Sequence, residues 1–231
     1  MTTPLCNVFW RTMDKHNAPR VRDAARSRAD ILAAAEACFA DKGFYGTSMN
    51  DIASLACINK RMLYAYFDSK ENLYKQVLFT VYQRMEAVEV ELLKSDPHGV
   101  ELIVSIITAY FDFLKNNPTF VSIIMRENLS HAGYLNELPL EHVQRKTLDD
   151  IRQRIRQGIA DGVFRPEVDA DQAVLSLIVV CFSNFSNRYT LSRLFTRNLE
   201  QDEIIEGRKQ HTIELVLAYL CGTEQSLQFL R

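Results

Sequence analysis

The sequence predicts an all-α protein. Apolar residues recur at three- and four-residue steps over long segments, which is the spacing of one face of a helix. No segment alternates for long with period two, and strands and helices do not alternate along the chain. The 231 residues are 47% apolar and include six prolines and eight glycines, which allows a real core and long helices. We expect about nine helices: an N-terminal three-helix domain with a helix-turn-helix, then a larger helical domain.

Residues 1–21 are predicted to form an N-terminal tail. Pro4 and Pro19 interrupt any helical period, and four arginines follow between residues 20 and 28. One interpretation is a basic arm that reaches a polyanion such as DNA. The alternative is a loosely ordered terminus, or an over-long start with Met13 as the true one.

The first helix is expected from Asp23 to Lys42. Its apolar stripe consists of Ile31, Leu32, Ala35, Cys38 and Phe39. Gly43 should end it, because glycine enters the left-handed conformation without steric cost.

Two short helices follow and form the predicted helix-turn-helix. Thr47 is expected to cap the first of them, whose apolar face is Met49, Ile52, Ala53 and Ala56. Residues 56–59 form the turn, and Asn59 caps the second helix. Leu63 and Phe67 should face inward, because they lie one helical turn apart.

The second short helix would then present Lys60, Arg61, Tyr64 and Tyr66 to solvent. Cations can meet phosphates or guanine edges, and tyrosine hydroxyls can donate to phosphate oxygens. Ser69 should cap the next helix, and Lys70 lies in its first turn, where free N–H groups suit a phosphate. The alternative is an ordinary helical hairpin, since outward basic and aromatic residues are common on all-α surfaces.

This stretch resembles the DNA-binding domain of the TetR family of transcriptional regulators over about residues 26–75. The matching residues are Phe39, Gly43, Thr47, Ser48, Ile52, Ala53, Ala56, Ile58, Leu63, Tyr64, Tyr66, Phe67, Ser69, Lys70, Glu71 and Leu73. One departure is Cys57, where the family usually has a glycine in the turn. Either Cys57 takes a left-handed backbone, at a cost of about 1 kcal/mol, or the turn is remodelled and the recognition helix tilts.

The resemblance implies which side chains meet DNA. They are Thr47, Ser48, Lys60, Arg61, Tyr64, Tyr66 and Lys70. We assign Thr47, Tyr64 and Lys70 to phosphates, and Lys60 and Arg61 to base edges. Ala65 replaces a large aromatic residue found in other members, and its methyl group could touch a thymine methyl.

Six longer helices are expected after the turn. They are residues 69–94, 100–115, 120–129, 140–161, 170–195 and 202–221. Residues 95–99 include Asp96, Pro97 and Gly99, a combination that breaks helices. The long helix 69–94 would join the DNA-binding domain (residues 22–75) to the effector-binding and dimerisation domain (residues 76–231) and could transmit a movement.

The last two helices predict a homodimer. Residues 173–185 are apolar nearly all round, so this helix must be covered on more than one side. The final helix supplies Ile204, Ile205, Ile213, Val216, Leu217 and Leu220. A four-helix contact between two copies would place two recognition helices one DNA turn apart, about 34–36 Å. The resemblance implies the same arrangement, and the alternative is an internal core without a dimer.

A small-molecule effector is expected among the middle helices. Candidate ligand-binding residues are Tyr110, Phe120, Arg126, Asn184 and Phe185, which combine aromatic surface with a few orienting polar groups. Such a lining favours a hydrophobic or aromatic effector. The alternative for most of these side chains is ordinary core packing, and for Arg126 a salt bridge.

The sequence shows no motif for metal binding, nucleotide binding or catalysis. The five histidines and five cysteines show no metal-ligand spacing, and no glycine-rich phosphate loop or GxSxG motif occurs. We therefore predict no cofactor, no metal and no enzymatic activity. The odd, widely spaced cysteines favour a reducing cytoplasm over a disulfide framework, although Cys57 or Cys181 could sense oxidants.

The charge distribution predicts one end that binds a polyanion, and the hydropathy predicts no membrane-spanning segment. The net charge is −2. Residues 1–75 carry eleven Lys/Arg and eight Asp/Glu, and the remainder carries 16 and 21, so a slightly basic end joins an acidic body. No apolar run approaches the ~20 residues of a membrane span, and the N-terminus is a poor signal peptide.

The sequence therefore predicts a dimeric, cytoplasmic, ligand-responsive repressor. It would bind a palindromic double-stranded DNA operator, and an effector would release it by shifting the helix at residues 69–94. One alternative is a DNA-binding regulator gated by a protein partner or by cysteine oxidation. Another is an all-α enzyme or scaffold with an unused helical hairpin.

Overall fold

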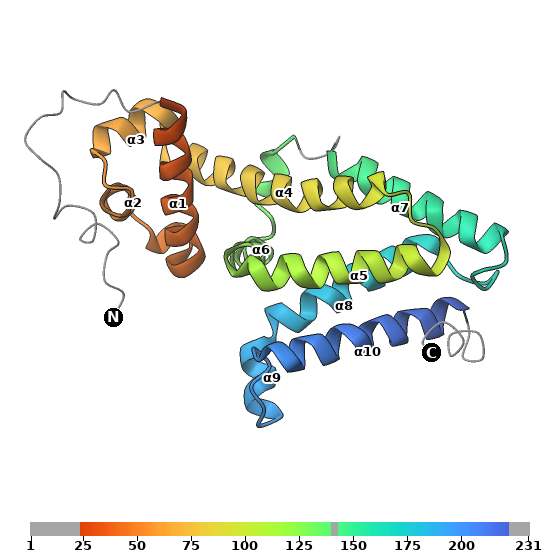
Figure 1. Ribbon diagram of the computed structural model, residues 1–231. Coiled ribbons are helices and arrows are strands. Elements are labelled where there is room, and N and C mark those ends of the chain that lie inside the picture. The colour runs from red at the N-terminus through yellow and green to blue at the C-terminus, as the bar shows by residue number, and fades with distance from the viewer. Residues whose placement is uncertain (1–23, 140–142, 222–231) are drawn as a thin grey trace, which may run out of the picture. The chain divides into compact units, whose positions relative to one another are not determined.

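A computed structural model describes residues 24–139 and 143–221 and confirms the all-α class (Figure 1). The described residues form ten α-helices and one 3-10 turn, with no strand. The chain divides into two compact units, Met1–Thr80 and Val81–Arg231, and the boundary falls within one long helix. The predicted tail (residues 1–21) and the predicted helix start at residue 140 lie outside the described residues.

The first unit contains α1 (Ala24–Gly46), α2 (Met49–Leu55), α3 (Lys60–Phe67) and the beginning of α4 (Lys70–Lys94). The helix α2 packs against both α1 and α3. The core side chains include Ile31, Ala35, Phe39, Met49, Ile52, Leu63, Phe67, Leu73 and Tyr74, all buried. Tyr74 was not among the predicted inward positions, and the others are the apolar positions that helical spacing predicts to face inward. One small core therefore holds the helix-turn-helix together.

Gly43 interrupts α1, as predicted. Its backbone has φ 72° and ψ 176°, a region that essentially only glycine occupies. The chain therefore turns at this point, and residues 44–46 form a separate final turn before α2.

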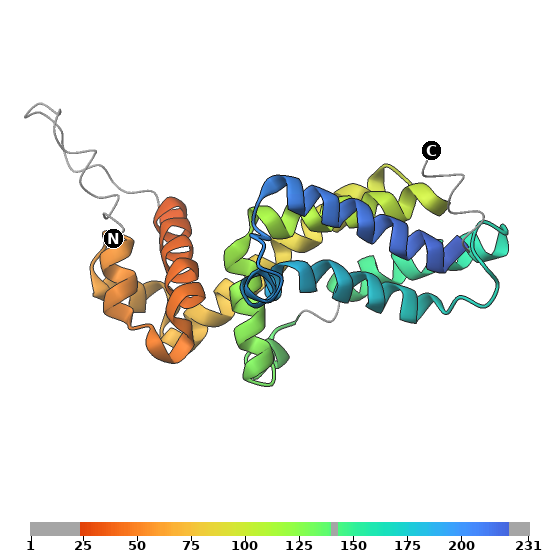
Figure 2. The same ribbon diagram turned by 90° about the horizontal axis from the view of Figure 1, so that it is seen from below.

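The second unit is built around α5. Its elements are the rest of α4 from Val81, α5 (Gly99–Asn116), α6 (Pro118–Leu129), the 3-10 turn Leu135–Glu137, α7 (Val143–Ala160), α8 (Ala170–Ser186), α9 (Arg188–Leu194) and α10 (Asp202–Cys221). The helix α5 contacts α6, α7, α8 and α10. In both ribbon views α8 and α10 lie side by side (Figures 1 and 2).

The predicted single helix over residues 170–195 is two helices, α8 and α9, and this difference accounts for ten helices in place of nine. The break falls at Asn187, whose side chain donates to the Ser183 carbonyl. Asn184 donates in the same way to the Val180 carbonyl. Short polar side chains compete in this way with the helical backbone and favour a helix end.

Among the described residues, no helix combines the length and the hydropathy that crossing a membrane requires.

Candidate nucleic-acid interface and effector cavity

The turn between α2 and α3 is a Schellman motif with a cysteine at its left-handed position. The Ile58 N–H donates to the Ala53 carbonyl at 3.0 Å, and the Cys57 N–H donates to the Ser54 carbonyl at 3.3 Å. In this motif the residue that follows the helix cap has a left-handed backbone and is usually glycine. Cys57 occupies that position with φ 53°, so of the two alternatives, a left-handed Cys57 or a remodelled turn, the structure has the first.

Ser48, and not Thr47, caps α2. The Asp51 N–H donates to Ser48 Oγ at 3.1 Å, and the Ser48 N–H donates to Asp51 Oδ2 at 2.9 Å. This reciprocal pair is a capping box. The hydrogen bond from the Ser48 backbone is the main cause of a lowered Asp51 pKa. The prediction that Thr47 caps α2 was wrong, because Thr47 lies one residue too early.

The Thr47 side chain is turned into the first unit. It is 2% exposed, and its Oγ1 lies 2.8 Å from the Gly43 carbonyl oxygen and 3.0 Å from that of Cys38. The hydroxyl therefore ties the start of α2 to the end of α1. A phosphate contact by this side chain would require the hydroxyl to leave both carbonyls.

The helix α3 presents the expected outward side chains. Asn59 caps it as predicted, accepting from the Arg61 N–H at 2.8 Å, and Leu63 and Phe67 are buried. The exposed residues are Lys60, Arg61, Tyr64 and Ala65, and Tyr66 is half-buried. A short helix anchored on one side, with two cations and a tyrosine on the other, can enter a major groove.

Lys70 has a different geometry from the one expected. Its ammonium donates to the carbonyl oxygens of Phe44 at 3.0 Å and Thr47 at 3.1 Å, and it lies 4.3 Å from the Phe44 ring centre. Ser69 caps α4 through the Asn72 N–H, as predicted. The first turn also carries Glu71, whose carboxylate weakens the attraction of this helix end for a phosphate.

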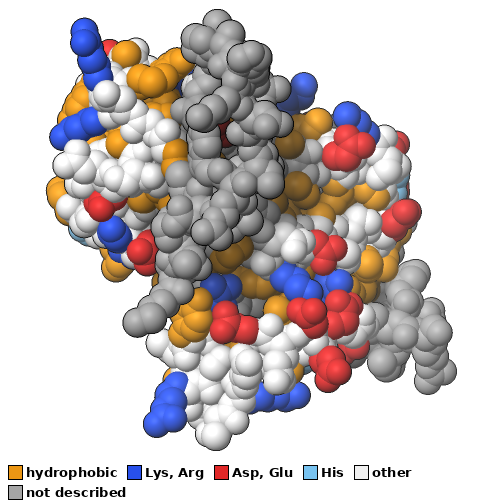
Figure 3. Space-filling model, turned by 60° about the vertical axis from the view of Figure 1, so that its left-hand side comes forward, with side chains coloured by type: hydrophobic (Ala, Val, Ile, Leu, Met, Phe, Trp, Pro, Cys, Tyr) orange, Lys and Arg blue, Asp and Glu red, His pale blue; other side chains and the backbone are white. Residues whose placement is uncertain are grey.

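The surface charge is mixed. On the face drawn in Figure 3, Lys and Arg side chains are interspersed with acidic and hydrophobic side chains, and neither sign forms a broad continuous surface. Among the described residues that this view draws, the cations are therefore separate side chains and do not form an extended basic face.

The second unit contains a cavity of about 710 Å³ where α8 and α9 meet the end of α5 and the start of α10. Its apolar lining consists of Phe111, Pro118, Phe185, Leu191, Phe195, Leu199, Ile204 and Ile205. Its charged lining consists of Lys115, Arg188, Arg197, Glu200 and Arg208. The volume lies within the range of small-molecule sites, about 300–1,000 Å³.

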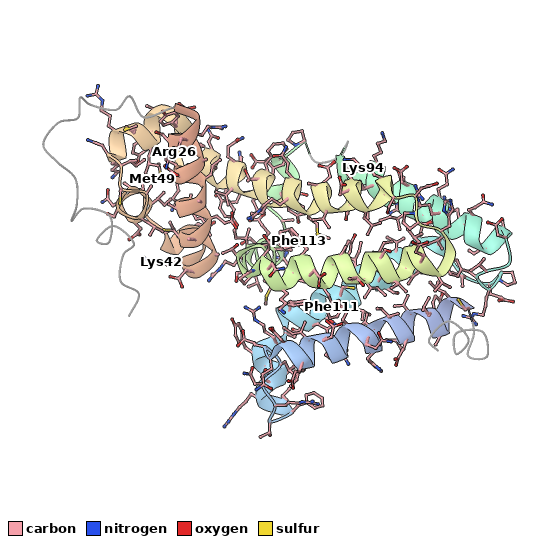
Figure 4. All side chains as sticks on the ribbon, viewed as in Figure 1. Arg26, Lys42, Met49, Lys94, Phe111 and Phe113 are labelled. Carbon is pink, nitrogen blue, oxygen red and sulfur yellow. The ribbon has the colours of Figure 1, made fainter. Side chains whose placement is uncertain are left out.

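The two phenylalanines at the end of α5 face different neighbours. Phe111 lines the cavity and makes an edge-on contact with Phe185, with ring centres 5.5 Å apart. Phe113 packs edge-on against Phe120 of α6. In Figure 4 the labelled Phe111 and Phe113 lie on opposite sides of α5, as a two-residue separation in a helix requires.

The predicted ligand-binding residues do not form one site. Asn184 and Phe185 line the cavity, whereas Tyr110, Phe120 and Arg126 are not among its lining residues. The cavity is lined mainly by α8, α9 and α10, and the middle helices contribute only the end of α5 and Pro118 at the start of α6. Sequence spacing missed the cationic lining, because Lys115, Arg188 and Arg208 come from three helices far apart in the chain.

Tyr110 instead belongs to a buried polar cluster. Its hydroxyl donates to Glu89 Oε1 at 2.6 Å, and the Thr147 hydroxyl donates to Glu89 Oε2 at 2.7 Å. Burial is the main cause of a raised pKa for both Glu89 and Tyr110. Glu89 follows Val81 and Met85 at four-residue steps on α4, so the helical period could have revealed a carboxylate on the inner face.

The cysteines differ in their accessibility. Cys57 is exposed, and Cys181 is buried, which raises the pKa of its thiol to about 12. A thiol with so high a pKa stays protonated and resists oxidation. No group of three or more His, Cys, Asp or Glu side chains that could hold a metal occurs in the described part of the chain.

Taken together, the anchored α3 and the separate helical unit define a helix-turn-helix transcription regulator. Two family models match the chain: the bacterial regulatory proteins of the tetR family over residues 31–77, and the tetracyclin repressor-like C-terminal domain over residues 100–216. The chain belongs to the TetR family of transcription regulators, as the sequence motifs predicted.

Relatives cover most of the chain. It is 31% identical over 181 residues to the transcriptional repressor NicS of Pseudomonas putida, which spans 78% of this chain and 85% of that protein. A structure of the ketosteroid regulator KstR2 of Mycobacterium tuberculosis has a TM-score of 0.65 at 22% identity, covering 89% and 99% of the two chains. FadR of Bacillus subtilis, solved with stearoyl-CoA, has a TM-score of 0.63 at 18% identity, covering 83% and 98%.

Proposed function

We propose that the protein is a homodimeric repressor that binds a two-fold-symmetric operator through α3 and is released by a small molecule. The observation that carries this proposal is the geometry of α3. Its inner side is fixed by Leu63, Phe67 and the Schellman turn, and its outer side presents Lys60, Arg61 and Tyr64. The matched relative NicS is named as a transcriptional repressor, which supports repression over activation.

The last helices of the second unit support the homodimer. Leu175 and Val179 on α8, and Leu215 and Tyr219 on α10, are about half exposed although they are large and apolar. Since α8 and α10 pack on each other, these side chains offer an apolar surface for the same two helices of a second copy. The α3 helices of the two copies would then enter two successive major grooves, about 34–36 Å apart.

The cavity supports release by an effector. It is lined by α8 and α10, the helices assigned to the dimer, so a ligand that binds one arrangement of these helices more tightly will shift the dimer toward it. The protein FadR, which shares the fold, was solved with stearoyl-CoA, so a small-molecule complex is compatible with this architecture. The protein would act in the cytoplasm, where the operator lies.

Gating by oxidation is a second candidate, and one observation favours it. Cys57 is exposed within the turn that sets α3, so a bulky adduct on its sulfur would press on the recognition helix. Peroxide treatment that leaves operator affinity unchanged would exclude this route.

A footprint on the DNA flanking the protein's own gene tests the proposal. We expect a protected two-fold-symmetric site whose affinity falls steeply with salt, because phosphate contacts release counterions. Weak, salt-labile binding without a protected site on this or other genomic DNA would contradict it.

A further inference from the structure

The cavity of the second unit has two chemically different sides. Eight of its fifteen lining residues are apolar, and Phe111 and Phe185 form an aromatic wall. Four others are Lys or Arg, and only one is acidic, Glu200. An apolar wall beside an excess of cations is suited to a molecule with an apolar body and a negatively charged group.

Arg208 is held at this cavity by a neutral partner. Its Nε donates to Asn184 Oδ1 at 2.9 Å. Asn184 is itself oriented, because its Nδ2 donates to the Val180 carbonyl at 2.7 Å. An amide fixes the direction of the guanidinium without cancelling its charge, so Arg208 keeps an attraction for an anion that an Arg–carboxylate pair would already have satisfied.

Two of the other three cations, Lys115 and Arg188, carry counter-charges that a ligand could replace. Lys115 lies 2.9 Å from Asp202, and the Arg188 Nε lies 3.3 Å from Glu200. The Arg188 guanidinium is also close to the Tyr189 ring, at 4.7 Å. These contacts keep both cations at the rim of the cavity, where a second anionic oxygen could meet them.

We propose that this cavity binds an organic acid with an apolar body, whose carboxylate or phosphate meets Arg208 and whose apolar part packs against Phe111 and Phe185. The regulatory consequence rests on the proposed function: the acid bridges α8 and α10 and so biases the dimer. The binding itself does not depend on that function and can be measured without DNA.

Two matched sets of probes separate charge from hydrophobicity. Decanoate, decyl phosphate and decanol share one chain, and 2-naphthoate and 2-naphthol share one ring system. Calorimetric titration of the full-length protein should give binding by at least one acid and at least tenfold weaker binding by its alcohol. The ratio between decanoate and decyl phosphate then tells a carboxylate site from a phosphate site.

Variants assign the binding to this cavity. R208Q removes the charge at an exposed position and should weaken acid binding at least tenfold while leaving alcohol binding unchanged. N184A keeps the charge but removes its orienting partner, and should weaken acid binding to a smaller extent. R193A is the matched control, because Arg193 is exposed on α9 and does not line the cavity, and it should bind the acids as the wild type does.

Three results would overturn the inference. They are an alcohol that binds as tightly as its acid, acid binding that R208Q does not change, and no binding by any acid probe. If R208Q instead changed only the dimer dissociation constant, the cavity would belong to the contact between copies. In each case operator binding by the ligand-free protein remains measurable, so failure here is distinct from failure of the repressor proposal.

Discussion

The ammonium of Lys70, in the first turn of α4, donates to the backbone carbonyl of Phe44 and lies over the ring of the same residue. One side chain thereby joins the start of α4 to the end of α1 by two kinds of interaction. The family resemblance predicts Lys70 at a DNA phosphate, but the structure favours a role within the first unit. The two roles have different consequences for stability and for salt dependence.

We expect Lys70→Met to lower the free energy of unfolding by about 1–2 kcal/mol, because two carbonyls lose a charged donor and the cation–π contact disappears. Urea denaturation of the full-length protein measures this loss. At temperatures where the variant is folded, the salt slope of operator binding should equal that of the wild type. A slope smaller by about 0.9 would show that Lys70 neutralises a phosphate after all.

Cys57→Gly should stabilise the protein. Glycine adopts the left-handed backbone of the Schellman turn without steric cost, which is worth about 0.5–1 kcal/mol at this position. Cys57→Ala is the control, since alanine keeps the strain and removes only the sulfur, and its stability should stay close to that of the wild type. Equal stabilisation by both variants would mean that the thiol, and not the backbone, is unfavourable here.

Glu89 should make stability depend on pH. Burial raises the pKa of this carboxyl above its ordinary value of 4.5, against the effect of the hydrogen bonds from Tyr110 and Thr147. The folded state therefore binds the proton more tightly than the unfolded chain does. This group stabilises the fold below pH 4.5, and that contribution is lost as the pH rises through the raised pKa.

Glu89→Gln removes this titration and can still hydrogen-bond both hydroxyls if one of them reverses as acceptor. Relative to the wild type, its free energy of unfolding should rise between pH 4.5 and pH 7. Glu89→Ala removes the carboxylate that accepts from Tyr110 and Thr147 and leaves a void, and it should cost about 2–4 kcal/mol. Denaturant titrations across this pH range give both results. Parallel pH profiles for the wild type and the glutamine variant would contradict the shifted pKa.

Val179→Glu tests the dimer surface. Val179 is 54% exposed on α8, and a carboxylate there would be buried without a partner if α8 and α10 pair with a second copy. Analytical ultracentrifugation should show a shift from dimer to monomer. Leu129→Glu, at an 82% exposed apolar position on α6, is the control and should leave the dimer intact. A dimer unchanged by Val179→Glu would place the contact elsewhere.

Local pattern was sufficient for much of the fold. Helical spacing placed Ile52, Leu63 and Phe67 in the core, and the backbone freedom of glycine placed the break in α1 at Gly43. Both features depend on near neighbours in the chain. The resemblance left two alternatives at Cys57, a left-handed backbone or a remodelled turn, and the structure has the first. Ser48 and Thr47 are adjacent hydroxyl residues, and only the carboxylate of Asp51 three residues later distinguishes the cap.

Features that depend on distant segments were not predictable. The carbonyls that hold Lys70 belong to residues 23 and 26 positions earlier. The cavity joins the end of α5 to α8, α9 and α10, so no spacing along the chain brings Lys115 near Arg208. The inward role of Tyr110 depends on Glu89 and Thr147, which come from two other helices.

Whether α3 reads the operator sequence can be tested by comparing affinities for the operator and its single-base-pair variants. The affinities of the wild type, Arg61→Ala and Lys94→Ala would be compared on the operator and on versions with each base pair replaced in turn. Arg61 is exposed in the first turn of α3, whereas Lys94 ends α4 in the second unit and pairs with Glu91. Lys94→Ala therefore controls for the loss of one surface charge.

We expect Arg61→Ala to cost about 1–3 kcal/mol on the intact operator and to lose discrimination at one base pair in each half-site, at symmetric positions. Lys94→Ala should keep the full wild-type preference. If Arg61→Ala weakened binding to every sequence equally, or left the preferences unchanged, Arg61 would not contact a base edge and the assignment of α3 as the recognition helix would be contradicted.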